Sequence, residues 1–337
     1  MSAVVRGPFR AQCVAVGAAL PERRLTNAEL ERLVDTTDEW IVSRTGIRER
    51  RILDPGKALS DLATPAARQC LERAGVQASD IDGIIIATIT GDYVMPATAN
   101  IVQHQIGATK AWAFDLLNAC NGFVAALSTA TCFIEAGRAR RILVLGGDVM
   151  STRVDYKDRN TCVLFGDGCG AVLLEAASPD GPGIEGFELH SDGSGAAELI
   201  VPSSGSAQPT TPERISQRAQ FIKQNGRTVF SHAVRAMCEV STSLLKTLGR
   251  SRDDIDLLVP HQANSRIIEP IAQRLGLPMS KVVMNIETCA NTTGGTIPLA
   301  LADAFADGRL TTGTRCMLVA FGGGFTWGAC YLTWGRA

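Results

Sequence analysis

The sequence predicts an α/β protein built from two copies of one unit, stacked as five layers in the order αβαβα. Short apolar segments rich in β-branched residues alternate with helical patterns, which is typical of α/β proteins with mostly parallel sheets. Residues 79–86 also recur in similar form as residues 253–260, and each copy follows a helical stretch that ends in a glycine. Since an internal repeat determines the architecture, we divide the chain into an N-terminal half (1–180) and a C-terminal half (181–337).

Strands and helices are expected from the start of the N-terminal half. Thr26 and Glu29 have the spacing of a capping box and predict a helix that ends at Val34. Residues 35–51 are polar and rich in arginine, so we expect turns there. Hydrophobic periodicity and glycine stops predict strands at 14–18, 83–88, 142–145 and 171–174, and helices at 63–74, 100–106 and 120–136.

The C-terminal half begins near Gly181 and contains the same kinds of element. Residues 202–212 are rich in Ser, Pro and Thr, which indicates a surface loop. Residues 231–248 predict a long helix that Ser231 is placed to cap, and a strand is expected to end at Pro260.

Bulk composition excludes several classes of function. The chain has 337 residues, of which 45% are hydrophobic and 20% charged, as in globular proteins. Its net charge of −1 argues against nucleic acid or an anionic membrane as the main partner. No apolar run is long enough to span a bilayer, and no signal peptide is visible, so we expect a cytoplasmic protein.

The ten cysteines are irregularly spaced and form no C-x-x-C pair, which disfavours zinc and redox sites. A reducing compartment is the simplest setting for them. Most lie in apolar stretches and are expected to act as small buried hydrophobic residues, among them Cys132, Cys169, Cys316 and Cys330.

The repeat aligns Cys120 with Asn291. Cys120 opens a predicted helix, where unpaired backbone N–H groups and the helix dipole favour a thiolate nucleophile. A buried, inert cysteine is the alternative interpretation. Asn291 precedes Thr-Thr-Gly-Gly and on its own would be a turn or helix cap. Because equivalent positions of two copies carry polar residues, we predict a site between the halves.

Two further segments follow predicted strands. His261 lies where the strand ending at Pro260 gives way to a helix, and α/β proteins place their sites at the carboxyl ends of strands. A capping or surface histidine is the alternative. Residues 322–324 are three glycines whose N–H groups are able to bind an oxyanion, with a tight bend between strands as the alternative.

Five motifs together resemble one family of enzymes. They are residues 35–50, 165–168, 259–264, 291–292 and 321–328, and in this order they resemble β-ketoacyl-acyl carrier protein synthase III. The resemblance runs from about Val14 to Leu332. It implies a thiolase-like fold with duplicated βαβαβαββ halves, and an acyltransferase that initiates fatty acid biosynthesis as a homodimer.

The resemblance also implies roles for residues. The Cys-His-Asn triad of the family falls on Cys120, His261 and Asn291. Cys120 would take an acetyl or other short acyl group from acyl-CoA, with the N–H groups of Cys120 and Gly323 as the oxyanion hole. Malonyl-acyl carrier protein would then lose CO2, with His261 and Asn291 stabilising the enolate, and condense with the acyl group. No metal and no tightly bound cofactor is implied.

Binding residues transfer in the same way. Trp40 and Arg159 would sandwich the adenine of CoA, and the remaining CoA and carrier-protein contacts would come from Arg44, Arg227, Asn264 and Arg266. Without the resemblance, these arginines would be assigned to a solvated surface. The acyl pocket would be lined by Met150, Leu164, Phe165, Phe230 and Phe321, and by Met95 from across the dimer interface.

Three alternatives remain open from the sequence. A same-fold condensing enzyme or acyltransferase of secondary metabolism would use another acyl donor, and a thioester hydrolase would keep water in the site. A non-catalytic partner subunit would lack the cysteine. Asn121 and Thr293–Gly295 differ from the common family pattern, which leaves the preferred primer open.

Overall fold

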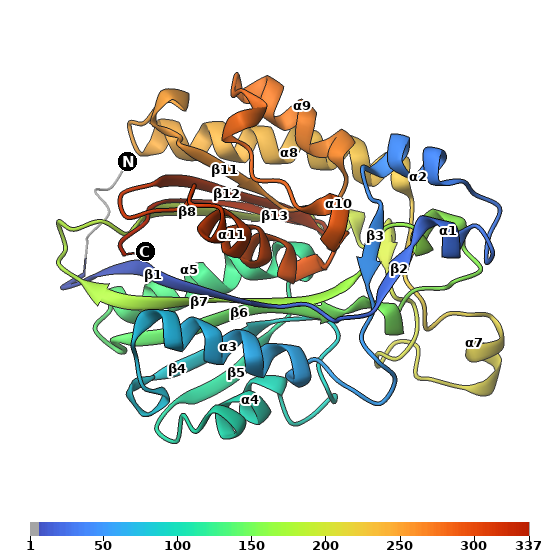
Figure 1. Ribbon diagram of the computed structural model, residues 1–337, viewed down its shortest axis with the longest axis horizontal. Helices are drawn as coiled ribbons and strands as arrows, with labels where there is room; N and C mark the ends of the chain where they lie inside the picture. Colours follow the sequence, from blue (N-terminus) through green and yellow to red (C-terminus); the bar gives the residue numbers. More distant parts are fainter. Residues whose placement is uncertain (1–6, 337) are drawn as a thin grey trace.

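The computed structural model describes residues 7–336, which form two large sheets, two small two-stranded sheets and three layers of helices (Figure 1). The first sheet has the strand order β1-β7-β6-β4-β5 and the second has the order β11-β12-β13-β8. Helices α5 (Gly122–Glu135) and α11 (Thr296–Ala306) lie between the sheets. Helices α3 (Ser60–Ala74) and α4 (Thr98–Ile106) cover one outer face, and α8 (Gly226–Thr247) and α9 (Ser265–Leu275) cover the other. The predicted αβαβα layering is confirmed.

The strands of each sheet come from one part of the chain. The first sheet contains β1 (Arg10–Ala19), β4 (Gly83–Ala87), β5 (Trp112–Leu116), β6 (Arg141–Val149) and β7 (Asp167–Ala177). The second contains β8 (Ile184–Ser191), β11 (Leu257–Pro260), β12 (Arg315–Gly322) and β13 (Thr326–Thr333). The chain therefore passes from one sheet to the other between Ala177 and Ile184, close to the division that we propose.

Both sheets are mixed, so the prediction of mostly parallel sheets is wrong. β4 pairs in parallel with β5 and β6, and β11 pairs in parallel with β12. The pairs β6–β7, β7–β1, β12–β13 and β13–β8 are antiparallel. Each half ends in two consecutive antiparallel strands, which need no crossover helix between them.

The second large sheet repeats the strand order of the first, but a single β-bridge replaces one edge strand. The position equivalent to β5 holds only a parallel bridge between Leu258 and Val282. The helix before β4 and the helix before β11 end in the same way, at glycines in the left-handed region (Gly75, φ 67°; Gly249, φ 64°). Glycine adopts this conformation without steric cost, which explains the glycine stops seen in the sequence.

Several predicted elements have different bounds. The segment 35–51 contains α2 (Asp38–Thr45) and β3 (Glu49–Arg51), which pairs with β2 (Arg24–Thr26), so turns alone are wrong there. The capping box of Thr26 is present, but its helix α1 (Asn27–Leu30) is shorter than predicted. Helix α8 begins at Gly226 and is capped by Asn225 rather than by Ser231. Residues 202–211 carry no helix or strand, and α7 (Pro212–Ser216) projects from the body (Figure 1).

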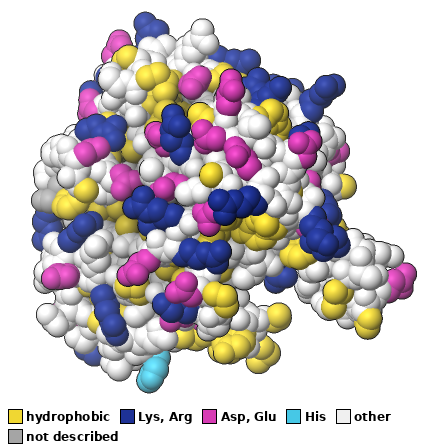
Figure 2. All heavy atoms as spheres, turned by 45° about the vertical axis from the view of Figure 1, so that its right-hand side comes forward, with side chains coloured by type: hydrophobic (Ala, Val, Ile, Leu, Met, Phe, Trp, Pro, Cys, Tyr) yellow, Lys and Arg dark blue, Asp and Glu magenta, His cyan; other side chains and the backbone are white. Residues whose placement is uncertain are grey.

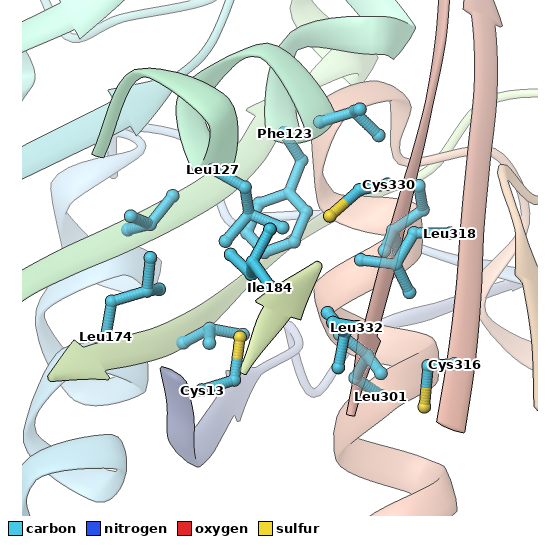
Figure 3. Packing of buried hydrophobic residues seen from close by; sticks show 14 of the residues in the cluster. Cys13, Phe123, Leu127, Leu174, Ile184, Leu301, Cys316, Leu318, Cys330 and Leu332 are labelled. Carbon is cyan, nitrogen blue, oxygen red and sulfur yellow. The ribbon is translucent and has the colours of Figure 1, made fainter. Parts of the chain in front are cut away.

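The largest core cluster lies between the two sheets. In Figure 3, Phe123 and Leu127 of α5 point toward Leu318 of β12, and Leu301 of α11 lies beside Leu332. Cys13, Cys316 and Cys330 are buried there as small hydrophobic residues (Figure 3). Cys132 is exposed instead, because the last turn of α5 turns one side to solvent.

Charges are mixed on the face seen in Figure 2, where Lys and Arg side chains intermingle with Asp and Glu. Within residues 7–336, no helix combines the length and the apolar character needed to cross a membrane.

Candidate active site

A cavity of about 190 Å³ brings the three predicted catalytic residues together. Cys120 reaches it from the start of α5, His261 from the loop after β11, and Asn291 from the loop before α11. All three side chains are buried. The structure therefore joins residues from both halves of the chain at one enclosed site.

The repeat also holds for the backbone around Cys120 and Asn291. Each residue directly follows an alanine in the left-handed region (Ala119, φ 46°; Ala290, φ 57°). Cys120 lies within the short 3-10 helix η2 (Ala119–Asn121), which leads into α5. Asn291 precedes the short 3-10 helix η7 (Thr293–Gly295), which leads into α11. Non-glycine residues rarely adopt positive φ, and such strain concentrates at functional sites.

The thiol of Cys120 is protonated at neutral pH. Burial raises its pKa to about 12, and the charge of the buried Asp148 carboxylate acts in the same direction. The predicted lowering of this pKa is therefore not seen, because burial is the largest cause of the shift and raises the pKa. A nearby proton acceptor is needed to activate the thiol.

His261 lines the same cavity as Cys120. Its backbone N–H donates to the Val319 carbonyl (2.8 Å), which ties the loop after β11 to β12. Burial lowers the pKa of the imidazole to about 3, so the ring is neutral at physiological pH. Its Nδ1 atom lies 2.7 Å from the Thr296 hydroxyl.

Asn291 lines the cavity with its amide oxygen already engaged. Its Oδ1 atom accepts a hydrogen bond from the Thr293 backbone N–H (2.9 Å), which is the turn contact expected from the sequence. Its backbone N–H donates to the Leu164 carbonyl (2.9 Å). Nδ2 has no hydrogen-bond partner among residues 7–336, so it is free to donate to a substrate.

The three glycines form the turn between β12 and β13, and they also border the site. Gly323 lines the cavity. Gly322 packs so closely against the Cys120 loop that an added Cβ would lie 2.7 Å from the Cys120 nitrogen. The tight bend is therefore confirmed, and it carries glycine backbone to Cys120. Oxyanion binding by these N–H groups stays a prediction.

A second hollow continues the cavity to the surface. The two share Leu164, Gln224, Gly226 and Asn264, and the outer one is also lined by Trp40 and Arg44. Arg227 and Arg266 are exposed and line neither hollow. The Arg159 guanidinium lies 5.1 Å from the centre of the Trp40 ring. Because these two side chains already contact each other, an adenine would enter between them only if Arg159 moved.

The predicted acyl pocket is reproduced in part. Leu164, Phe165, Phe230 and Phe321 line the cavity. Met150 is completely buried in the same apolar cluster as Phe165 and does not line it. Met95 does not line the cavity of its own chain, and it is 83% exposed. Sequence reasoning missed the wall formed by residues near β9 (Leu199–Ile200), β10 (Lys223–Gln224) and along α8, namely Leu199, Ile200, Val201, Ile222, Val229 and Met237.

Comparison with known proteins agrees with this arrangement. Residues 114–193 match the family described as 3-oxoacyl-[acyl-carrier-protein (ACP)] synthase III, and residues 245–334 match its C-terminal region. The beta-ketoacyl-[acyl-carrier-protein] synthase III of Chlorobaculum tepidum is 47% identical over 97% of this chain and 100% of its own length. The chain belongs to the β-ketoacyl-[acyl-carrier-protein] synthase III family.

Solved structures of synthase III proteins share the fold. The Thermus thermophilus synthase III is 42% identical, with a TM-score of 0.89 over 97% of this chain and all of that one. The priming beta-ketosynthase of the R1128 polyketide pathway is 32% identical, with a TM-score of 0.91 over 100% of this chain and 99% of that one. The predicted thiolase-like fold is thereby confirmed.

Proposed function

We propose that this chain takes an acetyl or other short acyl group from acyl-CoA and condenses it with malonyl-acyl carrier protein, which initiates fatty acid biosynthesis. The observation that carries the proposal is the meeting of a thiol, a neutral imidazole and a free amide donor in one buried cavity. The fit of the whole chain to the synthase III family supports the same reaction.

In the first half-reaction, Cys120 is the nucleophile. Its thiol proton passes to neutral His261 as sulfur bonds to the thioester carbon of acyl-CoA. The N–H groups of Cys120 and Gly323 would stabilise the tetrahedral oxyanion. When the intermediate collapses, the thiolate of CoA leaves and takes the proton from His261, and the acyl group stays on Cys120.

In the second half-reaction, malonyl-acyl carrier protein occupies the same cavity. His261 and Asn291 would hydrogen-bond its thioester carbonyl, where negative charge develops as CO2 leaves. The resulting enolate attacks the carbonyl of acyl-Cys120, and the C–S bond to Cys120 breaks to give a 3-ketoacyl thioester. The Cys120 thiolate that leaves takes a proton from solvent. No step of this scheme uses a metal or a bound cofactor.

The path to the surface supports binding of a phosphopantetheine arm from CoA or from the carrier protein. The outer hollow begins at Trp40 and Arg44 and ends at the cavity. Arg227 and Arg266 are exposed on the first turns of α8 and α9, which adds positive charge for phosphates or for acidic residues of a carrier protein.

Apolar residues at the edge of the first sheet support the homodimer. β5 is an edge strand, and Leu117 directly after it is 79% exposed. Val94 and Met95 are also strongly exposed, and large apolar side chains of this kind mark protein contacts. We propose that this edge meets a second copy of the chain and that Met95 reaches the partner's acyl pocket. We further propose a cytoplasmic location.

The condensation is tested with Asn291→Asp. Aspartate keeps an oxygen for the Thr293 N–H contact but removes the Nδ2 donor and adds negative charge beside the enolate. We expect acylation of Cys120 to persist, and formation of 3-ketoacyl carrier protein, followed by mass spectrometry, to fall about 100-fold or more. Wild-type rates of condensation in Asn291→Asp would contradict the role of Asn291.

A second candidate is priming of a polyketide pathway, which the likeness to the R1128 priming ketosynthase favours. Such an enzyme would use the same residues with a different acyl donor. A panel of acyl-CoAs of increasing length separates the two, since a fatty acid initiator should prefer short donors.

A further inference from the structure

The carboxylate of Asp148 lies where the two halves of the chain meet. Asp148 belongs to β6 of the first half and is completely buried. Its side chain does not line the active-site cavity, but it contacts Thr293 of the second half, which does. Burial raises the pKa of this carboxyl to about 6, so the group is largely ionised at pH 7.

The hydrogen bonds of this carboxylate come from both halves. Its Oδ1 atom accepts from the segment after β4, namely from the N–H groups of Ile89 and Thr90 (2.8 and 3.0 Å) and the hydroxyls of Thr88 and Thr90 (2.8 and 2.7 Å). Its Oδ2 atom accepts from the Thr293 hydroxyl, and the carboxylate also accepts from the Gly294 N–H. One side chain therefore ties the turn before α11 to the first sheet.

Thr293 has a backbone conformation that needs such support. Its φ is 50°, and a positive φ is a clear outlier for a β-branched residue. Strained conformations of this kind persist only where the surrounding contacts hold them. The Thr293 hydroxyl also lies 2.8 Å from the Thr292 carbonyl, but an ionised carboxylate is the stronger acceptor. We therefore attribute the hold on Thr293 mainly to Asp148.

Anchoring Thr293 also orients Asn291. The φ angle sets the direction of a residue's N–H relative to its side chain, so a fixed hydroxyl and a fixed φ together fix the N–H of Thr293. That N–H donates to Oδ1 of Asn291 (2.9 Å). Because an N–H only donates, the Asn291 amide must face it with oxygen, and Nδ2 is left as the free end.

We propose that Asp148 is a positioning residue for the condensation step, because it holds Thr293 in the conformation that keeps Nδ2 of Asn291 available to the malonyl thioester. The proposal rests on the proposed function for the role of Asn291. Asp148 itself contacts no substrate in this scheme and transfers no proton.

Asp148→Asn separates the two sides of the carboxylate. An amide has one acceptor oxygen, and the donors of residues 88–90 would take it. Its NH2 group would then face the Thr293 hydroxyl and the Gly294 N–H, so the contacts with the second half would be lost. The substitution also removes a charge that raises the pKa of Cys120, and this loss of charge does not disfavour acylation.

The rates of the two half-reactions are measured separately by mass spectrometry, as acylation of Cys120 by acetyl-CoA and discharge of the acyl group by malonyl-acyl carrier protein. We expect the ratio of condensation to acylation to fall about ten-fold or more in Asp148→Asn and in Thr293→Val. Thr293→Ser keeps the hydroxyl and should restore the ratio. A variant that is only less stable would lose both rates together, so an unchanged ratio in Asp148→Asn and Thr293→Val would overturn the proposal.

Crystal structures of the same variants give a second test that needs no activity. In Asp148→Asn and Thr293→Val, we expect Thr293 or its replacement to leave the left-handed region, or Asn291 to lose its contact with the N–H of residue 293. Wild-type geometry at both positions would overturn the proposal. Failure of the wild type to form a 3-ketoacyl product would instead contradict the proposed function, and these structures would still decide whether Asp148 holds Asn291.

Discussion

At the scale of the residue, Cys120 and His261 are both neutral and line one cavity. Burial raises the pKa of the thiol and lowers that of the imidazole, so the proton stays on sulfur at neutral pH. Charge separation is then confined to the proposed reaction, where the proposed oxyanion hole would stabilise the developing negative charge. A resting thiol is also less reactive toward oxidants than a thiolate.

The fall in stability at acidic pH should show that His261 is buried in its neutral form. Its pKa is about 3 in the folded chain and about 6.5 when unfolded. Below pH 6.5 the unfolded chain therefore binds more protons, and this group's contribution to stability falls as the pH drops. Between pH 7 and pH 5 it should lower the free energy of unfolding by about 2 kcal/mol.

His261→Ala is the matched comparison for this effect. Urea unfolding of both proteins at pH 7 and pH 5 gives the difference in stability at each pH. The buried Asp148, whose pKa is raised to about 6, titrates in the same window with the opposite sign, but it is present in both proteins. A difference that does not change with pH would show that His261 is not buried in its neutral form.

At the scale of the element, the alignment of Cys120 with Asn291 was predictable because the repeat extends through the turns before α5 and α11. Helix α2 was not predictable from hydrophobic periodicity, since only Ile41 and Thr45 of it are buried and no apolar stripe results. The strands β9 and β10 have two residues each, too few for any periodicity. The cavity wall near them was therefore missed.

The contact between His261 and Thr296 could not be predicted from the sequence either. The two residues are separated by 35 positions and meet only because the loop after β11 faces the start of α11. The raised pKa of Cys120, where a lowered one was predicted, has the same origin. The thiol is desolvated because the two halves pack around it. Residue types and their order thus indicated the chemistry. The protonation states could be predicted only once the packing around each side chain was known.

The end of β12 should tolerate no side chain at Gly322. Gly322→Ala places a Cβ 2.7 Å from the Cys120 nitrogen and 3.1 Å from that of Asn121, so the nucleophile loop must shift. We expect a loss of about 1–3 kcal/mol in the free energy of unfolding and a marked loss of Cys120 acylation. Gly193→Ala is the control, because nothing lies within 4 Å of its added Cβ. Equal behaviour of the two variants would contradict the close packing at Cys120.

At the scale of the whole molecule, the site exists only where the two halves meet. Cys120 and Asp148 come from the first half, and His261, Asn291 and Gly323 come from the second. The glycines at this boundary allow the backbones to approach, since an added Cβ at Gly146 would lie 2.2 Å from the Gly294 carbonyl oxygen. A stacked pair of repeats thus brings Cys120, His261 and Asn291 to one cavity.

Assembly is tested at the edge of β5. Val94→Asp combined with Leu117→Asp puts charge on two exposed apolar positions, and we expect a monomer by light scattering with reduced condensation. Met279→Asp, at an exposed apolar residue in the second half, should leave the dimer intact. A monomeric wild type would contradict the proposed homodimer.

The most direct test of the account is the mass of the intact protein after mixing with acyl-CoAs, beside Cys120→Ala. We predict one acyl adduct on the wild type with short donors, none on the variant, and discharge of the adduct by malonyl-acyl carrier protein with formation of a 3-ketoacyl product. An adduct that persists in Cys120→Ala, or the absence of any adduct on the wild type, would contradict the assignment of Cys120 as the nucleophile.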